Sequence, residues 1–258
     1  MNVLDLFNLK DKVALVTGAG QGIGKAIALA LSEAGANVAV ADINRTTGEQ
    51  TVNEIKKSGK KSLYIQVNLE HFEEIEKMVN ATMNYFEKID VLANVAGINR
   101  RLPALEMSQK DWRDVLRIDL DAVFFCCQSV GKEMIKQKKG NIINIASMSA
   151  SIINKDITQV AYGAAKSGVV NLTKALAVEW ITYNIRVNSI SPGMVLTPLV
   201  ENDFVKNIKM KNLVLENTPM KRFAQPKEIA SAAVFLASDA SSFMTGHDLI
   251  IDGGYTIW

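Results

Sequence analysis

The stretch "KVALVTGAGQGIG", Lys12 to Gly24, joins a short apolar run to a turn rich in glycine. The segment "GIGKAIALALSEAG" follows, with apolar residues at helical spacing and Gly35 as a stop signal. Glycines allow positive φ angles and let a pyrophosphate approach the N–H groups at the start of a helix. A strand, a glycine turn and a helix in this order therefore indicate a dinucleotide-binding unit.

The spacing of these glycines departs from G-x-G-x-x-G, because the third glycine would fall on Ile23. "TGAGQGIG", Thr17 to Gly24, fits T-G-x-x-x-G-x-G instead, and the physical argument is similar. The alternative for such a turn taken by itself is a tight connection that binds nothing. We expect the turn to bind a cofactor through Gly18, Gln21, Gly22, Ile23 and Gly24.

Short apolar runs alternate with helical patterns along the chain. These runs are near-continuous, as expected when helices cover both faces of a sheet. The alternation predicts an α/β fold with a doubly wound parallel sheet, formed by one domain over residues 1–258. The segment 193–218 is expected to be a substrate-binding loop or lid. Strands are expected at Lys12–Thr17, Asn37–Asp42, Ser62–Val67, Asp90–Val95, Asn141–Ser147, Ile185–Ser191 and Asp248–Gly253.

The composition excludes several classes of partner. Hydrophobic residues make up 48% of the 258 residues, which is enough for a substantial core. The net charge is +2 without a basic run, so we expect no nucleic-acid or membrane partner. No apolar run reaches the roughly 20 residues of a membrane helix, and the N-terminus does not read as a signal peptide. Adjacent Cys126 and Cys127 indicate reduced packing residues in a cytoplasmic protein. His71 and His247 lack metal-ligand spacing, so no metal is expected.

Asp42 ends the second predicted strand, about 20 residues after the glycines. A carboxylate at this position accepts hydrogen bonds from ribose hydroxyls and repels a 2′-phosphate. Gln21 adds no positive charge to the turn, although Arg45 is close in sequence. The pattern favours NAD over NADP.

"QVAYGAAKSG", Gln159 to Gly168, places Tyr162 and Lys166 four residues apart, on one face of a predicted helix. An ammonium beside a phenol stabilises the phenolate and lowers its pKa, which suits a general acid/base for alcohol and carbonyl interconversion. Ser147 ends a predicted strand, where ligands bind in a parallel sheet, and can hydrogen-bond the substrate oxygen. We expect these three side chains to converge on one pocket.

The motifs together resemble the short-chain dehydrogenase/reductase family over nearly the whole chain. They are "TGAGQGIG", "NVAG" (Asn94–Gly97), Ser147, "YGAAK" (Tyr162–Lys166) and "SPG" (Ser191–Gly193), in the family's order and spacing. The resemblance implies a Rossmann-type fold with seven strands, a nicotinamide cofactor and commonly a homotetramer. It also implies that Lys166 holds the nicotinamide ribose. Further cofactor contacts are implied for Asn94, Ala96, Gly97, Pro192, Gly193, Val195 and Thr197.

Two positions depart from the family pattern. Asp119 stands where the family usually has an asparagine, whose main-chain carbonyl helps to hold a water leading to the lysine. We expect catalysis to survive, with a proton relay altered by the charge. After the third strand, Asn68 and Leu69 replace a frequent aspartate near the adenine. Asn68 offers both a donor and an acceptor, so adenine can still be bound.

The substrate is indicated less directly. Arg100 and Arg101 follow the fourth strand and resemble a pair in family members that act on sugar acids, although two solvated arginines are the alternative. Ser149 and Asn154 lie near Ser147 in sequence and suit a substrate with several hydroxyls. These features favour NAD-linked oxidation of a polyol, sugar or sugar acid, or the reverse reduction. Reduction of a 3-oxoacyl thioester on an acyl carrier protein is the first alternative, and a non-catalytic cofactor sensor is the remote one.

Overall fold

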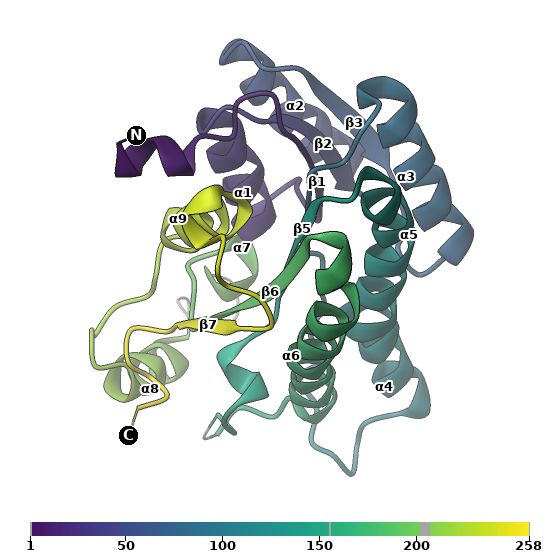
Figure 1. Ribbon diagram of the computed structural model, residues 1–258. Helices are drawn as coiled ribbons and strands as arrows, with labels where there is room; N and C mark the ends of the chain where they lie inside the picture. Colours follow the sequence, from purple (N-terminus) through teal and green to yellow (C-terminus); the bar gives the residue numbers. More distant parts are fainter. Residues whose placement is uncertain (1, 155, 202–206, 258) are drawn as a thin grey trace.

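Seven parallel strands form one sheet in the part of the chain that the structure describes, in the order β3-β2-β1-β4-β5-β6-β7 (Figure 1). This computed structural model describes residues 2–154, 156–201 and 207–257, so part of the predicted lid lies outside the described residues. The predicted Rossmann-type sheet is confirmed, with strand ends within two residues of expectation. The strands are β1 Val13–Thr17, β2 Asn37–Asp42, β3 Ser62–Gln66, β4 Val91–Asn94, β5 Gly140–Ile145, β6 Ile185–Pro192 and β7 Asp248–Ile251.

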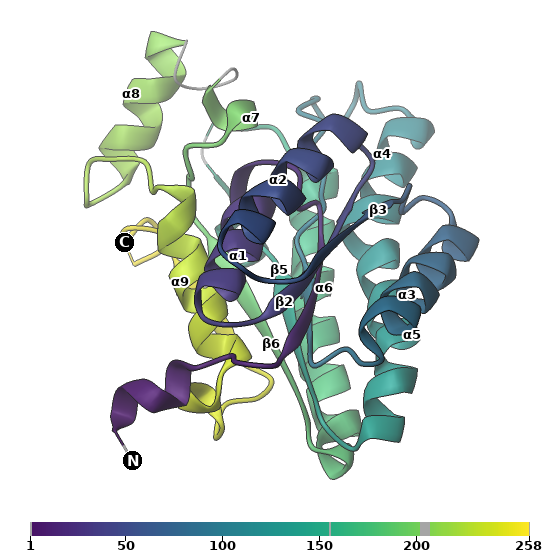
Figure 2. The ribbon, with the colours of Figure 1, turned by 90° about the horizontal axis from the view of Figure 1, so that it is seen from above.

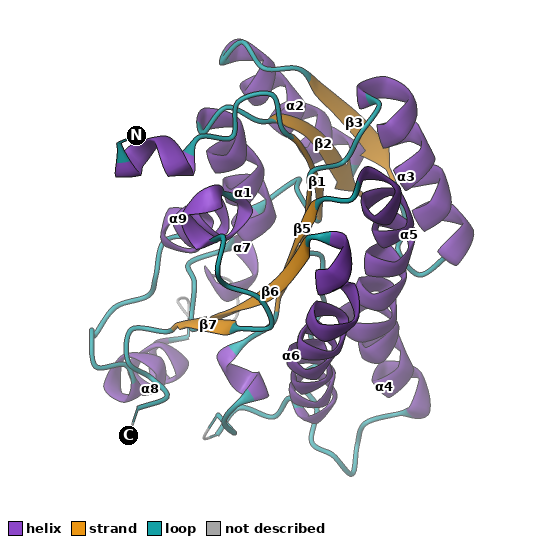
Figure 3. Cartoon of the chain, in the orientation of Figure 1, coloured by secondary structure: helices purple, strands orange, loops and turns teal. Residues whose placement is uncertain are grey.

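Helices connect the strands and cover both faces of the sheet (Figure 3). A five-residue π-helical segment, Arg117–Asp121, interrupts the long helical stretch before β5. The helices are α1 Gly22–Glu33, α2 Arg45–Lys57, α3 Phe72–Phe86, α4 Gln109–Leu116, α5 Ala122–Gln137, α6 Val160–Trp180, α7 Pro198–Val200, α8 Ile208–Asn217 and α9 Pro226–Ala237.

Two hydrophobic cores lie on opposite faces of the sheet. One core packs α1, α2 and α9 against β1, β2 and β4, and the other packs α3, α5 and α6 against the opposite face. Figure 2 shows α1 and α9 on one side of the strands and α3 and α5 on the other. Every residue of β1, β4 and β5 is buried, which explains the near-continuous apolar runs in the sequence.

The strand order places a crevice at the centre of the sheet. The chain runs from β1 outward to β2 and β3, then returns to place β4 on the other side of β1. In open parallel sheets, ligands bind at the carboxyl ends of the strands beside such a reversal. The glycine turn after β1 and the loop after β4 therefore meet at the expected binding position.

Candidate active site

A cavity of about 520 Å³ opens at the carboxyl ends of the strands. It is lined by the glycine turn, by the segments after β2 to β6, and by α6 and α7. Most of the residues that the sequence indicated line it, although they come from eight separate segments. They are Gly18, Gln21, Gly22, Ile23, Gly24, Asp42, Asn68, Leu69, Ala96, Gly97, Arg100, Arg101, Asp119, Ser147, Ser149, Tyr162, Lys166, Pro192, Gly193, Val195 and Thr197.

Two of the predicted contact residues lie behind the cavity wall. Asn94 is 3% exposed, and its amide donates to Asn144 Oδ1 at 2.9 Å. Asn154 is also 3% exposed, and its amide donates to Ser149 Oγ at 2.7 Å. Asn154 thus supports Ser149 of the site, whereas Asn94 bonds Asn144 inside the sheet, and neither side chain lines the cavity as we had expected.

The glycine turn has the backbone geometry that its sequence requires. Gly18 and Gly22 have φ angles of +65° and +55°, in the left-handed region that favours glycine. A Cβ added to Gly24 would lie 2.0 Å from the carbonyl oxygen of Gly18, so only glycine allows this close approach. The turn thereby leaves room for a dinucleotide at the start of α1.

Asp42 is tied to the glycine turn by its carboxylate. Its Oδ2 accepts from the Gly20 N–H at 2.7 Å, and its Oδ1 accepts from the Asn44 N–H at 2.9 Å. These bonds hold the carboxylate at the cavity, at the end of β2. Arg45 pairs with Glu49 at 2.8 Å and does not line the cavity.

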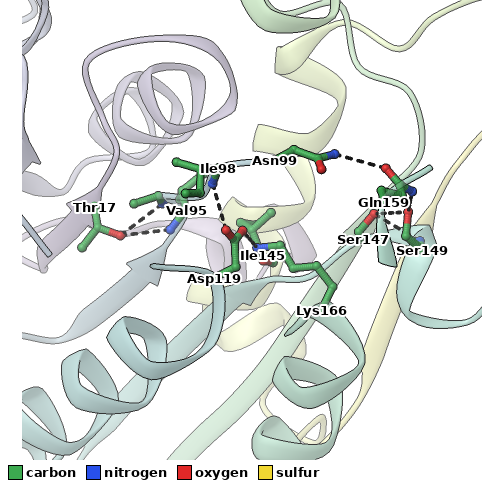
Figure 4. A network of polar contacts seen from close by, with 11 residues as sticks. Thr17, Val95, Ile98, Asn99, Asp119, Ile145, Ser147, Ser149, Gln159 and Lys166 are labelled. Carbon is green, nitrogen blue, oxygen red and sulfur yellow. Dashed lines mark hydrogen bonds and ion pairs between the residues drawn. The ribbon is translucent and has the colours of Figure 1, made fainter. Parts of the chain in front are cut away.

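Thr17 links the ends of β1 and β4, a role that the sequence did not reveal. Its hydroxyl oxygen accepts from the N–H groups of Val95 and Ala96, at 3.0 and 3.4 Å (Figure 4). A Cβ on Gly18 would lie 2.8 Å from Ala96 Cα, so the two loops pack closely. The threonine that precedes the first glycine in the motif was the available signal.

Lys166 is held inside the protein beside Tyr162. The lysine is 3% exposed, and its ammonium donates to the Ile145 carbonyl at 3.0 Å. Its Nζ lies 5.5 Å from the centre of the Tyr162 ring. The helix α6 carries both residues, so the i,i+4 spacing places them together as expected.

Asp119 brings a carboxylate directly to Lys166. The two side chains form an ion pair with Oδ1 and Nζ 3.1 Å apart, and Asp119 Oδ2 accepts from the Ile98 N–H at 2.9 Å (Figure 4). Burial raises the pKa of Asp119 above its usual range, against the opposing effect of Lys166. Burial acts to lower the pKa of Lys166, but Asp119 and Tyr162 outweigh it and raise that pKa. The resemblance had implied a main-chain role for this position, and the direct ion pair was not foreseen.

A second polar network surrounds Ser147, two residues after β5. The Ser147 hydroxyl donates to Ser149 Oγ at 3.2 Å and accepts from the Ser149 N–H at 3.1 Å. Ser149 Oγ also accepts from the Gln159 amide at 2.8 Å, and Gln159 Oε1 accepts from Asn99 at 3.1 Å (Figure 4). Sequence reasoning missed Gln159 and Asn99, whose only signal was proximity to Tyr162 and to Gly97.

The paired arginines lie at the cavity with different surroundings. Arg100 is exposed, and its Nε lies 3.8 Å from Asp111 Oδ1. Arg101 lines the same wall of the cavity. The guanidinium charge of Arg100 is therefore partly balanced by Asp111.

Three further findings concern the classes that composition addressed. The described residues contain no group of three or more side chains suited to a metal ion. Within the same residues, no helix has the length and apolar character to cross a membrane. Cys126 and Cys127 are buried and not bonded to each other, and burial raises the pKa of the Cys127 thiol to about 12.

Comparison with known proteins identifies the family. A sequence profile described as enoyl-(acyl carrier protein) reductase matches residues 18–256. The chain is also 43% identical over 253 residues to an NAD-dependent glycerol dehydrogenase of Listeria innocua, covering 97% of this chain and 96% of that protein. The chain belongs to the short-chain dehydrogenase/reductase family. It is therefore a nicotinamide-dependent oxidoreductase that acts on CH–OH groups, and the sensor alternative is set aside.

Other members of the family share its length and fold. A D-threitol dehydrogenase of Mycolicibacterium smegmatis is 42% identical over 253 residues, covering 97% of this chain and 95% of that protein. A crystal structure of a gluconate 5-dehydrogenase from Burkholderia cenocepacia, in complex with NADP and tartrate, superposes with a TM-score of 0.94 at 33% identity. That similarity covers 100% of both chains. Relatives of this short-chain dehydrogenase/reductase thus include enzymes named for polyols and for a sugar acid.

Proposed function

We propose that this enzyme interconverts a secondary alcohol and a ketone on a polyol, sugar or sugar acid, with NAD as its cofactor. The observation that carries the proposal is one cavity lined by Ser147, Tyr162 and Lys166, with a neighbouring wall of neutral hydroxyl and amide groups. Such groups donate and accept hydrogen bonds without a charge, which suits a substrate with several hydroxyls. The polyol relatives support the same substrate class.

Each residue of the proposed reaction has a separate task. The Tyr162 phenolate takes the proton of the substrate hydroxyl during oxidation, and the phenol returns it during reduction. The Ser147 hydroxyl hydrogen-bonds the substrate oxygen as charge develops on it. The buried ammonium of Lys166 stabilises the phenolate electrostatically and holds the nicotinamide ribose. When bound, the nicotinamide accepts or supplies the hydride.

NAD is proposed over NADP on the position of two charges. The Asp42 carboxylate lines the cavity at the end of β2, where it would accept hydrogen bonds from a ribose and repel a 2′-phosphate. Arg45, the nearby cation in sequence, is paired with Glu49 outside the cavity. The glycerol dehydrogenase relative is named as NAD-dependent and the gluconate 5-dehydrogenase structure contains NADP, so cofactor choice differs within the family.

Replacing Asp42 with serine is expected to shift the ratio of kcat/KM for NAD to that for NADP toward NADP by about ten- to hundredfold. A change of that size corresponds to about 1.4–2.8 kcal/mol, which is reasonable for removing one partly exposed like charge. The measurement is steady-state kinetics with each cofactor at a fixed substrate concentration. Glu76→Gln is the control, since it removes an exposed carboxylate of α3 that does not line the cavity, and it is expected to leave the ratio unchanged. An unchanged ratio in Asp42→Ser would contradict the assignment.

A 3-oxoacyl-[acyl-carrier-protein] reductase remains the second candidate. The family profile is described in terms of the acyl carrier protein, and Arg100 and Arg101 give the cavity mouth a positive side that suits an acidic carrier. The same arginines suit the carboxylate of a sugar acid. The position of Asp42 disfavours the NADP that such reductases usually require.

A substrate panel distinguishes these candidates. Polyols, aldonates and 3-oxoacyl thioesters are offered with NAD or NADH as the direction requires, and turnover is read from NADH absorbance. We expect the highest kcat/KM with a polyol or sugar acid, and little turnover of the thioester. A thioester as the best substrate would support the second candidate. Absence of turnover with all three, despite NADH binding, would refute the proposed function.

Three further expectations complete the proposal. The segment 193–218 is proposed as a substrate loop, since Met194, Leu199 and Val200 from its described part line the cavity. A homotetramer is proposed from the common state of the family. A cytoplasmic location is proposed because Cys126 and Cys127 are buried free thiols.

A further inference from the structure

Asp119 is a charged side chain in one of the most buried positions of the described structure. It is 0% exposed, and its partner Lys166 is 3% exposed. An isolated buried charge is strongly unfavourable, whereas two opposite charges in contact offset much of that cost. Each charge of this buried pair, with Nζ and Oδ1 3.1 Å apart, therefore depends on the other for its stability.

The backbone around Asp119 is arranged to accept a carboxylate. The residue lies in the π-helical segment Arg117–Asp121, and such segments are frequent at functional sites. The N–H of Ile98 donates to its Oδ2, so one oxygen has a backbone partner while the other faces the ammonium. A Cβ added to Gly97 would lie 2.6 Å from Oδ1, so a glycine at this position allows the loop to close over the pair.

We propose that Asp119 is a positioning residue that holds the ammonium of Lys166 beside Tyr162 and thereby sets the pH range in which the enzyme works. This inference rests on the proposed function, because it concerns the proton exchange at Tyr162. Asp119 Oδ2 accepts from the Ile98 N–H, and Oδ1 is buried against the Lys166 ammonium and makes no other hydrogen bond, so the carboxylate acts on Lys166.

The charges that act on this pair come from few groups. Among the described residues, Tyr162 on α6 is the one titratable group outside the pair that acts on it. The loop after β4 contributes the Ile98 N–H, and β5 contributes the Ile145 carbonyl to Lys166. Without the Asp119 charge, burial of Lys166 is opposed less strongly, and the ammonium releases its proton at a lower pH.

The test is Asp119→Asn, which keeps the size of the side chain and an acceptor for the Ile98 N–H but removes the charge. We expect the limb of the kcat/KM profile that depends on the Lys166 ammonium to move to lower pH by about one unit or more, the usual effect of one opposite charge at short distance. The pH dependence of NADH binding, followed by fluorescence, is expected to shift in the same direction, because Lys166 is proposed to hold the ribose.

Asp90→Asn is the matched control. Asp90 also accepts from a backbone N–H, that of Val13 at 2.9 Å, and pairs with Lys88 at 3.1 Å, but it lies before β4 at the opposite end of the strand from Gly97. We expect this variant to lose some stability and to keep the wild-type pH profile. A wild-type pH profile in Asp119→Asn would overturn the inference and show that Asp119 has only a structural role. Should no substrate be turned over, the NADH titration still decides the inference independently of the proposed function.

Discussion

Replacing Tyr162 with phenylalanine will lower kcat by about 10²–10⁴-fold, the contribution of a positioned general acid/base. The substitution removes one hydroxyl and keeps the ring that lies 5.5 Å from Lys166 Nζ. The cavity and the ion pair of Lys166 with Asp119 are expected to stay intact, so the dissociation constant for NADH will change little. The measurements are kcat from NADH absorbance and cofactor affinity from fluorescence titration.

The control for this substitution is Tyr255→Phe. Tyr255 is 6% exposed and does not line the cavity, so it tests the general effect of removing a buried phenol hydroxyl. We expect this variant to turn over substrate at nearly the wild-type rate. Wild-type turnover in Tyr162→Phe, with the cofactor still bound, would eliminate the proposed acid/base chemistry and leave only a nucleotide-binding fold.

Replacing Lys166 with methionine will lower the free energy of unfolding by about 3–5 kcal/mol, the typical cost of leaving one member of a buried ion pair alone. Methionine has a similar length, so the change leaves the Asp119 carboxylate 0% exposed and without its cation. Activity will also be lost, because the phenolate loses its stabilising charge. Chemical denaturation followed by circular dichroism measures the first effect, and NADH absorbance measures the second.

The double variant Lys166→Met/Asp119→Asn separates these two effects. It removes both charges and keeps an acceptor for the Ile98 N–H, so most of the lost stability is expected to return. Activity is not expected to return with it, because no cation is restored beside Tyr162. Stability losses that simply add across the two substitutions would show that the residues are not energetically coupled, contrary to the geometry.

The elements of the fold could be predicted because their signals are local. The strands β1, β4 and β5 are wholly buried, so their apolar runs were nearly continuous and easily recognised. The glycine turn was visible because Gly18 and Gly22 require φ angles that other residues rarely adopt. The strand ends were less well defined, since hydrogen bonding to neighbouring strands decides where each strand stops.

The side chains behind the site were harder to predict. Asn94 and Asn154 were expected to contact ligands, yet they lie within the protein and hold Asn144 and Ser149. Gln159 was not singled out, although its amide joins Ser149 to Asn99. The sequence does not show whether an asparagine or glutamine lies in a cavity wall or behind it, because the packing of the folded chain decides this.

The sequence alone determined the order of strands and helices along the chain, the glycine turn after β1 and the pairing of Tyr162 with Lys166, because residues one helical turn apart must share a face. It did not determine that Asp119 reaches Lys166, which requires the π-helical segment and the loop at Gly97 to meet α6. The tertiary structure decided this contact. Burial then made it important, because charges removed from water interact far more strongly than charges at the surface.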